Sequence, residues 1–129
     1  MDMFANTAFP ELAKMLDVLS ERHRVIANNV ANVNTPGYRS QDVAFQSVLR
    51  QISQFKQNAE SAEQFTQQLA DVRPEKIFNG AGFDNQGIND VDMDREMVNL
   101  AANTLLFKTY AQMMLMQLTQ LKTAINERV

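Results

Sequence analysis

The two ends of the sequence each carry a long stripe of mostly apolar residues at alternating spacings of three and four. This spacing puts the side chains on one face of an α-helix and is typical of helices that pack along their length. The first stripe is Phe9, Leu12, Leu16, Leu19, His23, Ile26, Val30 and Val33. The second stripe is Met93, Met97, Leu100, Thr104, Phe107, Ala111, Met114, Leu118, Leu121 and Ile125. The stripes predict helices at about 8–33 and 92–127.

The first helix is expected to end in a sharp turn. Asn34 and Thr35 favour turns through side-chain bonds to the nearby backbone. Pro36 has no N–H to donate and pushes Thr35 out of the helical region. Pro36 and Gly37 suit the two central positions of a type II turn, because glycine tolerates positive φ. The predicted conformational turn therefore spans Asn34, Thr35, Pro36, Gly37 and Tyr38.

Residues near the ends of the two helices fit their expected positions. Asn6 or Thr7 is a candidate cap for the first helix, and Pro10 suits its first turn. Asp92 is a good N-cap for the last helix. Charges that suit a helix dipole lie at both ends of the last helix: Asp92, Asp94, Glu96, Lys122 and Arg128. Off the first stripe, Glu21, Arg22 and Arg24 predict a solvated face.

The middle of the chain is less regular. Residues 38–43 are expected to be extended or irregular, and helical spacing returns at about 43–57. The polar segment 58–71 fits either a weak amphipathic helix or a mobile connection. Three glycines and several Asp and Asn residues at 79–89 indicate turns or a short hairpin.

These elements predict an all-α fold. Its long N- and C-terminal heptad helices pack as an antiparallel coiled-coil pair, with a short helix and an irregular or small β segment between them. The chain divides into three parts: residues 1–34 are the N-terminal helix of the axial core that the two long helices form, residues 35–91 are the middle segment, and residues 92–129 are the C-terminal helix of that core. Leu105, Leu106, Leu115 and Met116 widen the last apolar face beyond what one neighbour would cover. An exposed apolar stripe of this length marks a partner surface, so assembly is expected to complete the core.

Composition excludes several classes of protein. The chain of 129 residues allows one domain, and its net charge of −3 with scattered basic residues argues against nucleic-acid binding. The absence of cysteine excludes disulfide scaffolds and thiolate metal sites. The acidic, interrupted start Met1–Asn6 does not fit a cleaved secretory signal, and no window is apolar enough to span a membrane.

Candidate chemical sites are weak. His23 is the only histidine and has no partner ligands nearby in sequence, which favours a role in helix packing. The acidic run from Asp90 to Glu96 fails the calcium-loop pattern, since Arg95 and Ala101 stand where Gly and Glu are required. The methionines of the last helix favour core or interface packing over a promiscuous groove. No catalytic arrangement, cofactor site or metal site is expected, so the chain is predicted not to be an enzyme.

Asparagine is unusually frequent where the first helix ends, although its helix propensity is poor. The residues are Asn28, Asn29, Asn32 and Asn34. They are compatible with a solvated face near a fraying end, or with an amide cluster that bonds to neighbouring subunits. The second interpretation is favoured by a resemblance to a known family.

The run from Ala27 to Arg39 resembles the N-terminal signature of the flagellar basal-body rod proteins, which hook proteins share in looser form. The segment Asn89–Glu96 resembles the start of the C-terminal helix in proximal rod proteins, where it is a conformational signature. The short middle segment between the helices leaves no room for the inserted domains of large members. The resemblance therefore implies a small proximal rod protein, most similar to the one nearest the membrane ring.

This resemblance implies a structural subunit that self-assembles with other rod proteins into the shaft that transmits torque across the periplasm. The expected partners are its own copies, other rod proteins, the membrane-ring adapter protein and, during secretion, the type III export apparatus. No nucleic acid, small-molecule substrate or cofactor is implied. The expected location is the periplasmic rod of the basal body, reached without a cleaved signal peptide. The alternative is a small helical export chaperone or adapter of a type III secretion system, which would have no need of the signature.

Sixteen residues of the two terminal helices are predicted to form the subunit interface. They are Leu12, Leu16, Leu19, Ile26, Asn28, Asn29, Val30, Asn32, Val33, Met97, Leu100, Phe107, Met114, Leu118, Leu121 and Ile125. The prediction rests on the heptad stripes and on the asparagine cluster.

Overall fold

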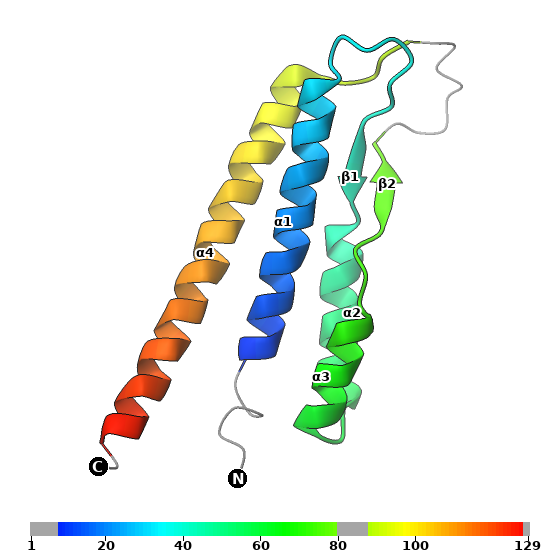
Figure 1. Ribbon diagram of the computed structural model, residues 1–129. Helices are drawn as coiled ribbons and strands as arrows, with labels where there is room; N and C mark the ends of the chain where they lie inside the picture. Colours follow the sequence, from blue (N-terminus) through cyan, green and yellow to red (C-terminus); the bar gives the residue numbers. More distant parts are fainter. Residues whose placement is uncertain (1–7, 80–87, 128–129) are drawn as a thin grey trace.

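A computed structural model describes residues 8–79 and 88–127 of the chain. The described chain is mostly helical, with four helices and one small antiparallel sheet. In chain order the elements are α1 (Phe9–Ala31), β1 (Gln41–Val43), α2 (Phe45–Asn58), α3 (Ala62–Asp71), β2 (Lys76–Phe78) and α4 (Met93–Asn126). Helix α1 lies between α4 on one side and a layer made of α2, α3 and the two strands on the other (Figure 1).

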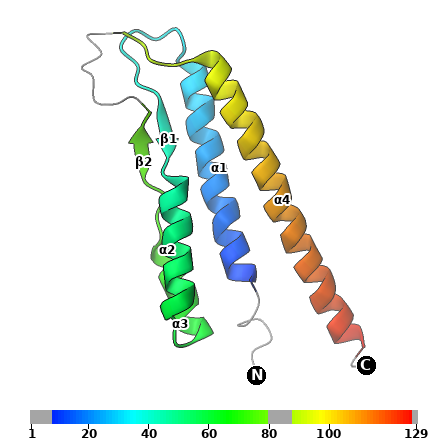
Figure 2. The same cartoon turned by 180° about the vertical axis from the view of Figure 1, so that it is seen from behind.

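The terminal helices run side by side in opposite directions, and they meet most closely where α1 ends and α4 begins (Figures 1 and 2). Helix α1 has 23 residues and α4 has 34. At 1.5 Å per residue, α4 is longer by about 16 Å. The C-terminal part of α4 therefore extends past the beginning of α1, as both views show.

The predicted ends of the two long helices are largely confirmed. Pro10 lies in the first turn of α1, while the candidate caps Asn6 and Thr7 lie outside the described residues. Asp92 caps α4, because its carboxylate accepts the backbone N–H groups of Asp94 and Arg95 at 3.0 and 3.2 Å. The last turn of α4 contains no basic residue, so the predicted support of its dipole by Lys122 is wrong. Arg128 lies outside the described residues.

The middle segment resolves into more structure than the sequence predicted. The 58–71 segment is a helix from Ala62 onward, and the hydroxyl of Ser61 caps it by accepting the N–H of Gln64 at 3.2 Å. The extended segment after the turn becomes β1, whose partner β2 lies at 76–78. The hairpin predicted at 79–89 falls mostly on 80–87, outside the described residues. The small sheet thus pairs two segments that α2 and α3 separate in the sequence.

The hydrophobic core lies between α1 and the layer of α2, α3 and β1. Its buried members are Met15, Val18, Val25, Val43, Val48, Ile52, Leu69 and Val72, with Phe45, Phe55, Phe65 and Tyr110 packed against them. Met15, Val18 and Val25 are not in the predicted stripe of α1. His23, predicted to serve in helix packing, is in the stripe; it is exposed and lines a hollow between α1 and α4. Because α1 has neighbours on two sides, its buried surface is wider than one heptad stripe and is centred elsewhere.

Helix α4 departs furthest from the expected coiled coil. Its only described buried side chains are Glu96 and Asn103, and neither belongs to the predicted stripe. Stripe members such as Met97, Leu118 and Ile125 are 51, 45 and 49% exposed. The expected antiparallel coiled-coil pairing of the two heptad stripes is therefore not confirmed. The contact between α1 and α4 instead includes two buried polar side chains of α4, Glu96 and Asn103, which bond to Asn29 and to the carbonyl of Leu19.

No helix of the described chain combines the length and apolarity that a membrane span requires.

Candidate functional site

The turn after α1 has the predicted geometry. Gly37 has a φ of 71°, and the N–H of Tyr38 donates to the carbonyl of Thr35 at 3.3 Å. These are the features of a type II turn with Pro36 and Gly37 at its centre. The predicted turn of Asn34, Thr35, Pro36, Gly37 and Tyr38 is thus the segment where the chain reverses from α1 toward β1.

The side chain of Asn89, just before α4, forms hydrogen bonds to this turn. Its amide nitrogen lies 2.7, 2.9 and 2.7 Å from the carbonyl oxygens of Asn32, Val33 and Thr35. Its own carbonyl oxygen accepts the N–H of Val91 at 2.8 Å. The two N–H groups of one side chain are therefore shared among three carbonyl groups at the end of α1 and in the turn. The sequence offered no signal for this contact, because the partners lie in opposite halves of the chain.

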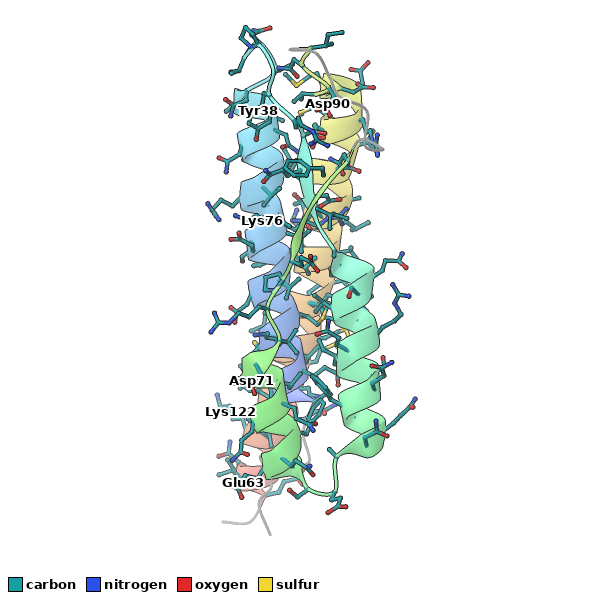
Figure 3. All side chains as sticks on the ribbon, turned by 90° about the vertical axis from the view of Figure 1, so that its right-hand side faces the viewer. Tyr38, Glu63, Asp71, Lys76, Asp90 and Lys122 are labelled. Carbon is teal, nitrogen blue, oxygen red and sulfur yellow. The ribbon has the colours of Figure 1, made fainter. Side chains whose placement is uncertain are left out.

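Asp90 makes a second link at the same end. Its carboxylate accepts the N–H of Ser40 at 2.5 Å, and its own N–H donates to the carbonyl of Tyr38 at 3.3 Å. Figure 3 shows Tyr38 and Asp90 together at this end of the molecule. The segment before α4, interpreted from sequence as a conformational signature, thus pairs with the chain after the turn.

Asn29 is the centre of the joint between α1, β1 and α4. Its side chain is fully buried, and its amide donates to the carbonyl of Gln41 at 2.7 Å and to the Glu96 carboxylate at 3.1 Å. Its oxygen accepts the N–H of Gln41 at 3.0 Å and the hydroxyl of Tyr38 at 3.3 Å. Both donors and both acceptor positions are used. Asn29, predicted to bond to a neighbouring subunit, makes all of these bonds within its own subunit.

Glu96 was expected to favour the start of α4 through the helix dipole, but its environment shows a further role. Its side chain is only 1% exposed and meets Asn29 across the helix pair. A buried carboxylate is costly unless it is hydrogen-bonded, so this contact fixes how α4 is placed along α1. Desolvation, followed by the negative charges of Glu96 and Asp90, raises the pKa of the Tyr38 hydroxyl.

Arg22 and Asp42 form the ion pair that attaches β1 to α1. Two guanidinium nitrogens of Arg22 donate to the two carboxylate oxygens at 2.8 and 2.9 Å, and both side chains are mostly buried. The bonds to Asp42 raise the pKa of Arg22, against the opposing effect of burial. Arg22 also lies 5.8 Å from the ring centroid of Phe45. The prediction that Arg22 belongs to a solvated face is therefore wrong.

The predicted interface residues of α1 and its C-terminal end divide into two groups. Leu12, Leu19 and Ile26 are buried within the subunit, as Asn29 is, so in the single chain they offer no surface to a neighbour. The remaining residues are exposed or half-buried: Leu16, Asn28, Val30, Asn32 and Val33. The amide of Asn32 donates to the carbonyl of Asn28 at 2.8 Å and its oxygen accepts the Thr35 hydroxyl. Asn32 therefore contributes to the turn as well.

The predicted interface residues of α4 are all accessible in the single chain. Met97, Phe107, Leu118 and Ile125 are exposed, and Leu100, Met114 and Leu121 are half-buried. Other apolar side chains emerge on different sides of the same helix, including Val98, Leu105 and Leu115 at 68, 67 and 63% exposure. Apolar side chains that emerge on several sides of one helix are normally covered by neighbours.

Two hollows open beside Thr104 in the N-terminal half of α4. One, of about 360 Å³, lies between the terminal helices and is lined by Ser20, His23, Asn103, Thr104 and Phe107. The other, of about 430 Å³, is lined by Met97, Leu100, Ala101, Thr104, Leu105 and Lys108. Within residues 8–79 and 88–127, no group of His, Asp and Glu side chains is arranged to hold a metal ion.

Comparisons with known proteins identify the family of this chain. Residues 16–39, which include the turn, match the family of flagella basal body rod proteins. The flagellar basal body rod protein FlgB of Escherichia coli is 32% identical over 102 residues, covering 72% of this chain and 74% of the relative. FlgB of Borrelia hermsii is 31% identical over 107 residues, covering 75 and 79%. FlgB of Bacillus subtilis is 29% identical over 127 residues, covering 98% of both chains.

The chain therefore belongs to the flagellar basal-body rod proteins, and within them to the FlgB family. Its function is that of a structural subunit of the proximal rod of the flagellar basal body. This is a family of structural proteins and not of enzymes. The turn bonded by Asn89 and the hydrogen-bonded joint of Asn29 and Glu96 thus belong to a structural subunit, and they position its helices.

Proposed function

We infer that this subunit assembles with its own copies and with other rod proteins into the helical shaft that transmits torque across the periplasm. The observation that carries this inference is the exposed apolar surface of α4. Burial of apolar surface contributes about 25 cal/mol per Å², so a long exposed helix of this kind favours association. The interface consists of the accessible predicted residues on α4, together with Leu16, Asn28, Val30, Asn32 and Val33.

The joint that Asn29 forms with β1 and α4, where α1 ends and α4 begins, supports the same function. A shaft requires every subunit to hold the same angle between its helices and its middle segment. The clamped turn and the bonds of Asn29 to β1 and α4 restrict that angle. A stiff joint lets a subunit pass torque to its neighbours without bending.

The further partners follow from the family resemblance. They are the membrane-ring adapter protein at the base of the rod and the type III export apparatus, which passes the subunit as an unfolded chain without a cleaved signal peptide. The site of action is the periplasmic rod. An intact N-terminus on the subunit recovered from rods, read by mass spectrometry, tests the export route.

The main test is incorporation. A bacterium that lacks its own FlgB-family subunit receives the gene for this chain, and basal bodies are purified in detergent. We expect the chain in the rods at a fixed ratio to other rod proteins. The alternative, a cytosolic export chaperone, predicts that the chain is absent from basal bodies and forms a stable small oligomer at every concentration. A rod subunit should be a monomer that polymerises as concentration rises.

A further inference from the structure

The two edges of the small sheet differ in how their backbone groups are bonded. β1 is the inner strand beside α1, and β2 lies on its outer side (Figures 1 and 2). On the inner edge, the N–H and the C=O of Gln41 are both bonded to the side chain of Asn29. The inner edge is therefore closed within the subunit.

The outer edge, on β2, is open. Antiparallel strands bond to each other through every second residue. Glu75 and Asn79, which flank β2, bond to the chain on either side of β1 at 2.9 and 3.0 Å. The backbone groups of Lys76 and Phe78 therefore point away from β1, and they form no hydrogen bond with any described residue. Each of these two residues offers one N–H and one C=O to a further strand.

The side chains of β2 are exposed as well. Ile77 is 44% exposed and Phe78 is 51% exposed. On one face of the strand, the guanidinium of Arg39 lies 4.1 Å from the ring centroid of Phe78. On the other face, Ile77 lines a hollow of about 350 Å³ together with Arg50 and the first residues of α2. The open edge thus has an aromatic ring on one face and a side-chain pocket on the other.

The lining of this hollow carries a net positive charge, because it contains two arginines and one aspartate. Asp42 is already paired with Arg22, which leaves Arg50 without an ion pair to any described residue. Helix α2 begins at the same hollow, and Ala44, which precedes it, has no side chain that could cap its first N–H groups. The start of a helix favours negative charge. A carboxylate is thus the group that best complements the hollow.

We propose that the outer edge of β2 binds an extended segment of a partner protein by strand addition. An acidic side chain of that segment enters the hollow beside Ile77, and the apolar side chain next to it lies on Phe78. In this binding mode the main-chain hydrogen bonds give affinity and the pocket gives specificity. The alternation of acidic and apolar residues follows from the two faces of a strand. β2 lies on the other side of α1 from α4, so the site is separate from the apolar surface of α4 (Figure 1).

The partner is a different protein, because a second copy does not match this edge. In the described part of the chain, acidic and apolar residues alternate in an extended stretch at 90–92, just before α4. Asp90 in this stretch is already bonded to the backbone of Ser40 and of Tyr38. A second copy could offer the stretch only by breaking these bonds. The β2 strand of a second copy carries Lys76 and no carboxylate.

The test uses a synthetic hexapeptide of alternating aspartate and valine. It is titrated into the isotope-labelled full-length chain, at a concentration where the chain is a monomer, and followed by NMR. We expect saturable binding in which the N–H signals of Lys76 and Phe78 shift most, since these groups gain acceptors. The N–H of Ile77 points toward β1 and should shift less. A hexapeptide of alternating lysine and valine is the control and should bind at least tenfold more weakly.

Two pairs of variants test the backbone and the charge separately. Phe78→Pro removes the outward N–H, which an open edge tolerates, whereas Phe78→Ala removes the ring and keeps the N–H. We expect Phe78→Pro to bind the aspartate peptide at least fivefold more weakly than Phe78→Ala. Arg50→Gln should weaken binding at least threefold. Lys56→Gln removes the same charge near the other end of α2 and should leave binding unchanged. Circular dichroism of each variant checks that the helices are intact.

Absence of saturable binding would overturn the proposal, and so would equal affinities of Phe78→Pro and Phe78→Ala. Equal binding of the lysine peptide would overturn the acidic class of partner. Shifts confined to α4 would show that the peptide binds the apolar surface instead, which also overturns the proposal. If the signals of Lys76 and Phe78 shift when the protein alone is concentrated, a second copy occupies the edge and the proposal is wrong. Incorporation into rods is measured separately, so each of these outcomes leaves the rod function intact.

Discussion

The two ends of the α1–α4 pair are built in opposite ways. At the upper end, where α1 ends and α4 begins, hydrogen bonds within the subunit connect α1, the turn, β1 and α4. They are made by Asn29, Glu96, Asn89 and Asp90. At the lower end, α4 continues past α1 and exposes apolar side chains such as Leu115, Leu118 and Ile125. Polar contacts depend on direction and distance, so they define an angle, whereas apolar surface is non-directional and supplies affinity. The subunit thus fixes its shape by polar contacts at one end, while the part of α4 beyond α1 offers apolar surface to neighbours.

The largest effect on the stability of the single chain is expected at Asn29. Asn29→Ala would leave the buried Glu96 carboxylate and the N–H and C=O of Gln41 without their partner. We expect the free energy of unfolding to fall by about 2–4 kcal/mol. Urea unfolding of the monomer measures this change. Asn28→Ala removes a neighbouring exposed amide and should change stability by less than about 0.5 kcal/mol. Equal losses for the two variants would show that the joint is not a centre of stability.

The next largest effect is expected at Gly37. Its φ of 71° is unfavourable for a β-branched residue, so Gly37→Val should cost on the order of 1–2 kcal/mol or more. Gly37→Asn should cost less, because asparagine tolerates the left-handed region. Thermal unfolding of the monomer and rod yield at matched subunit levels compare the two variants. If valine and asparagine behave alike at this position, the turn does not set the geometry of the joint.

A smaller effect is expected from titration of Tyr38. Desolvation and the nearby charges of Glu96 and Asp90 raise its pKa above the ordinary value of 10.0. The folded state therefore holds the phenolic proton more tightly than the unfolded state. This contribution is present below pH 10 and is lost as the pH rises through the folded pKa. The unfolding free energy should decline more steeply above pH 10 than in Tyr38→Phe, and parallel curves would contradict the assignment.

How much could be predicted from the sequence depended on how local each feature is. The turn at Pro36 and Gly37 and the cap at Asp92 involve residues within a few positions of one another, and both were predicted. The bond between Asn29 and Glu96 joins residues 67 positions apart, and nothing in the spacing of either residue indicates the other. The pairing of β1 with β2 was missed for the same reason.

The buried face of α1 was predicted only in part, for a different reason: Leu12, Leu19 and Ile26 of the stripe are buried, but the face extends beyond the stripe. A heptad count assumes one neighbour, whereas α1 packs against α4 on one side and against α2, α3 and β1 on the other. Met15, Val18 and Val25 are buried by the second neighbour, so they lie off the predicted stripe. For α4 the apolar pattern was recognised correctly, but its neighbours within the subunit cover only part of it.

The smallest effect on the single chain is expected at Leu118, where the effect on assembly should be the greatest. Leu118 is 45% exposed and lies beyond the part of α4 that packs against the core, so Leu118→Asp should change monomer stability by less than about 0.5 kcal/mol. In the polymer the same carboxylate would be buried among apolar side chains without a partner, which is costly. Rod incorporation should therefore fail, while secretion of the subunit continues because export acts on an unfolded chain. Gln67→Asp on α3 adds the same charge away from α4 and should leave incorporation intact. Motile cells with normal rods carrying Leu118→Asp would contradict the role of the lower end, because an exposed surface that tolerates a charge in the assembled state is not an interface.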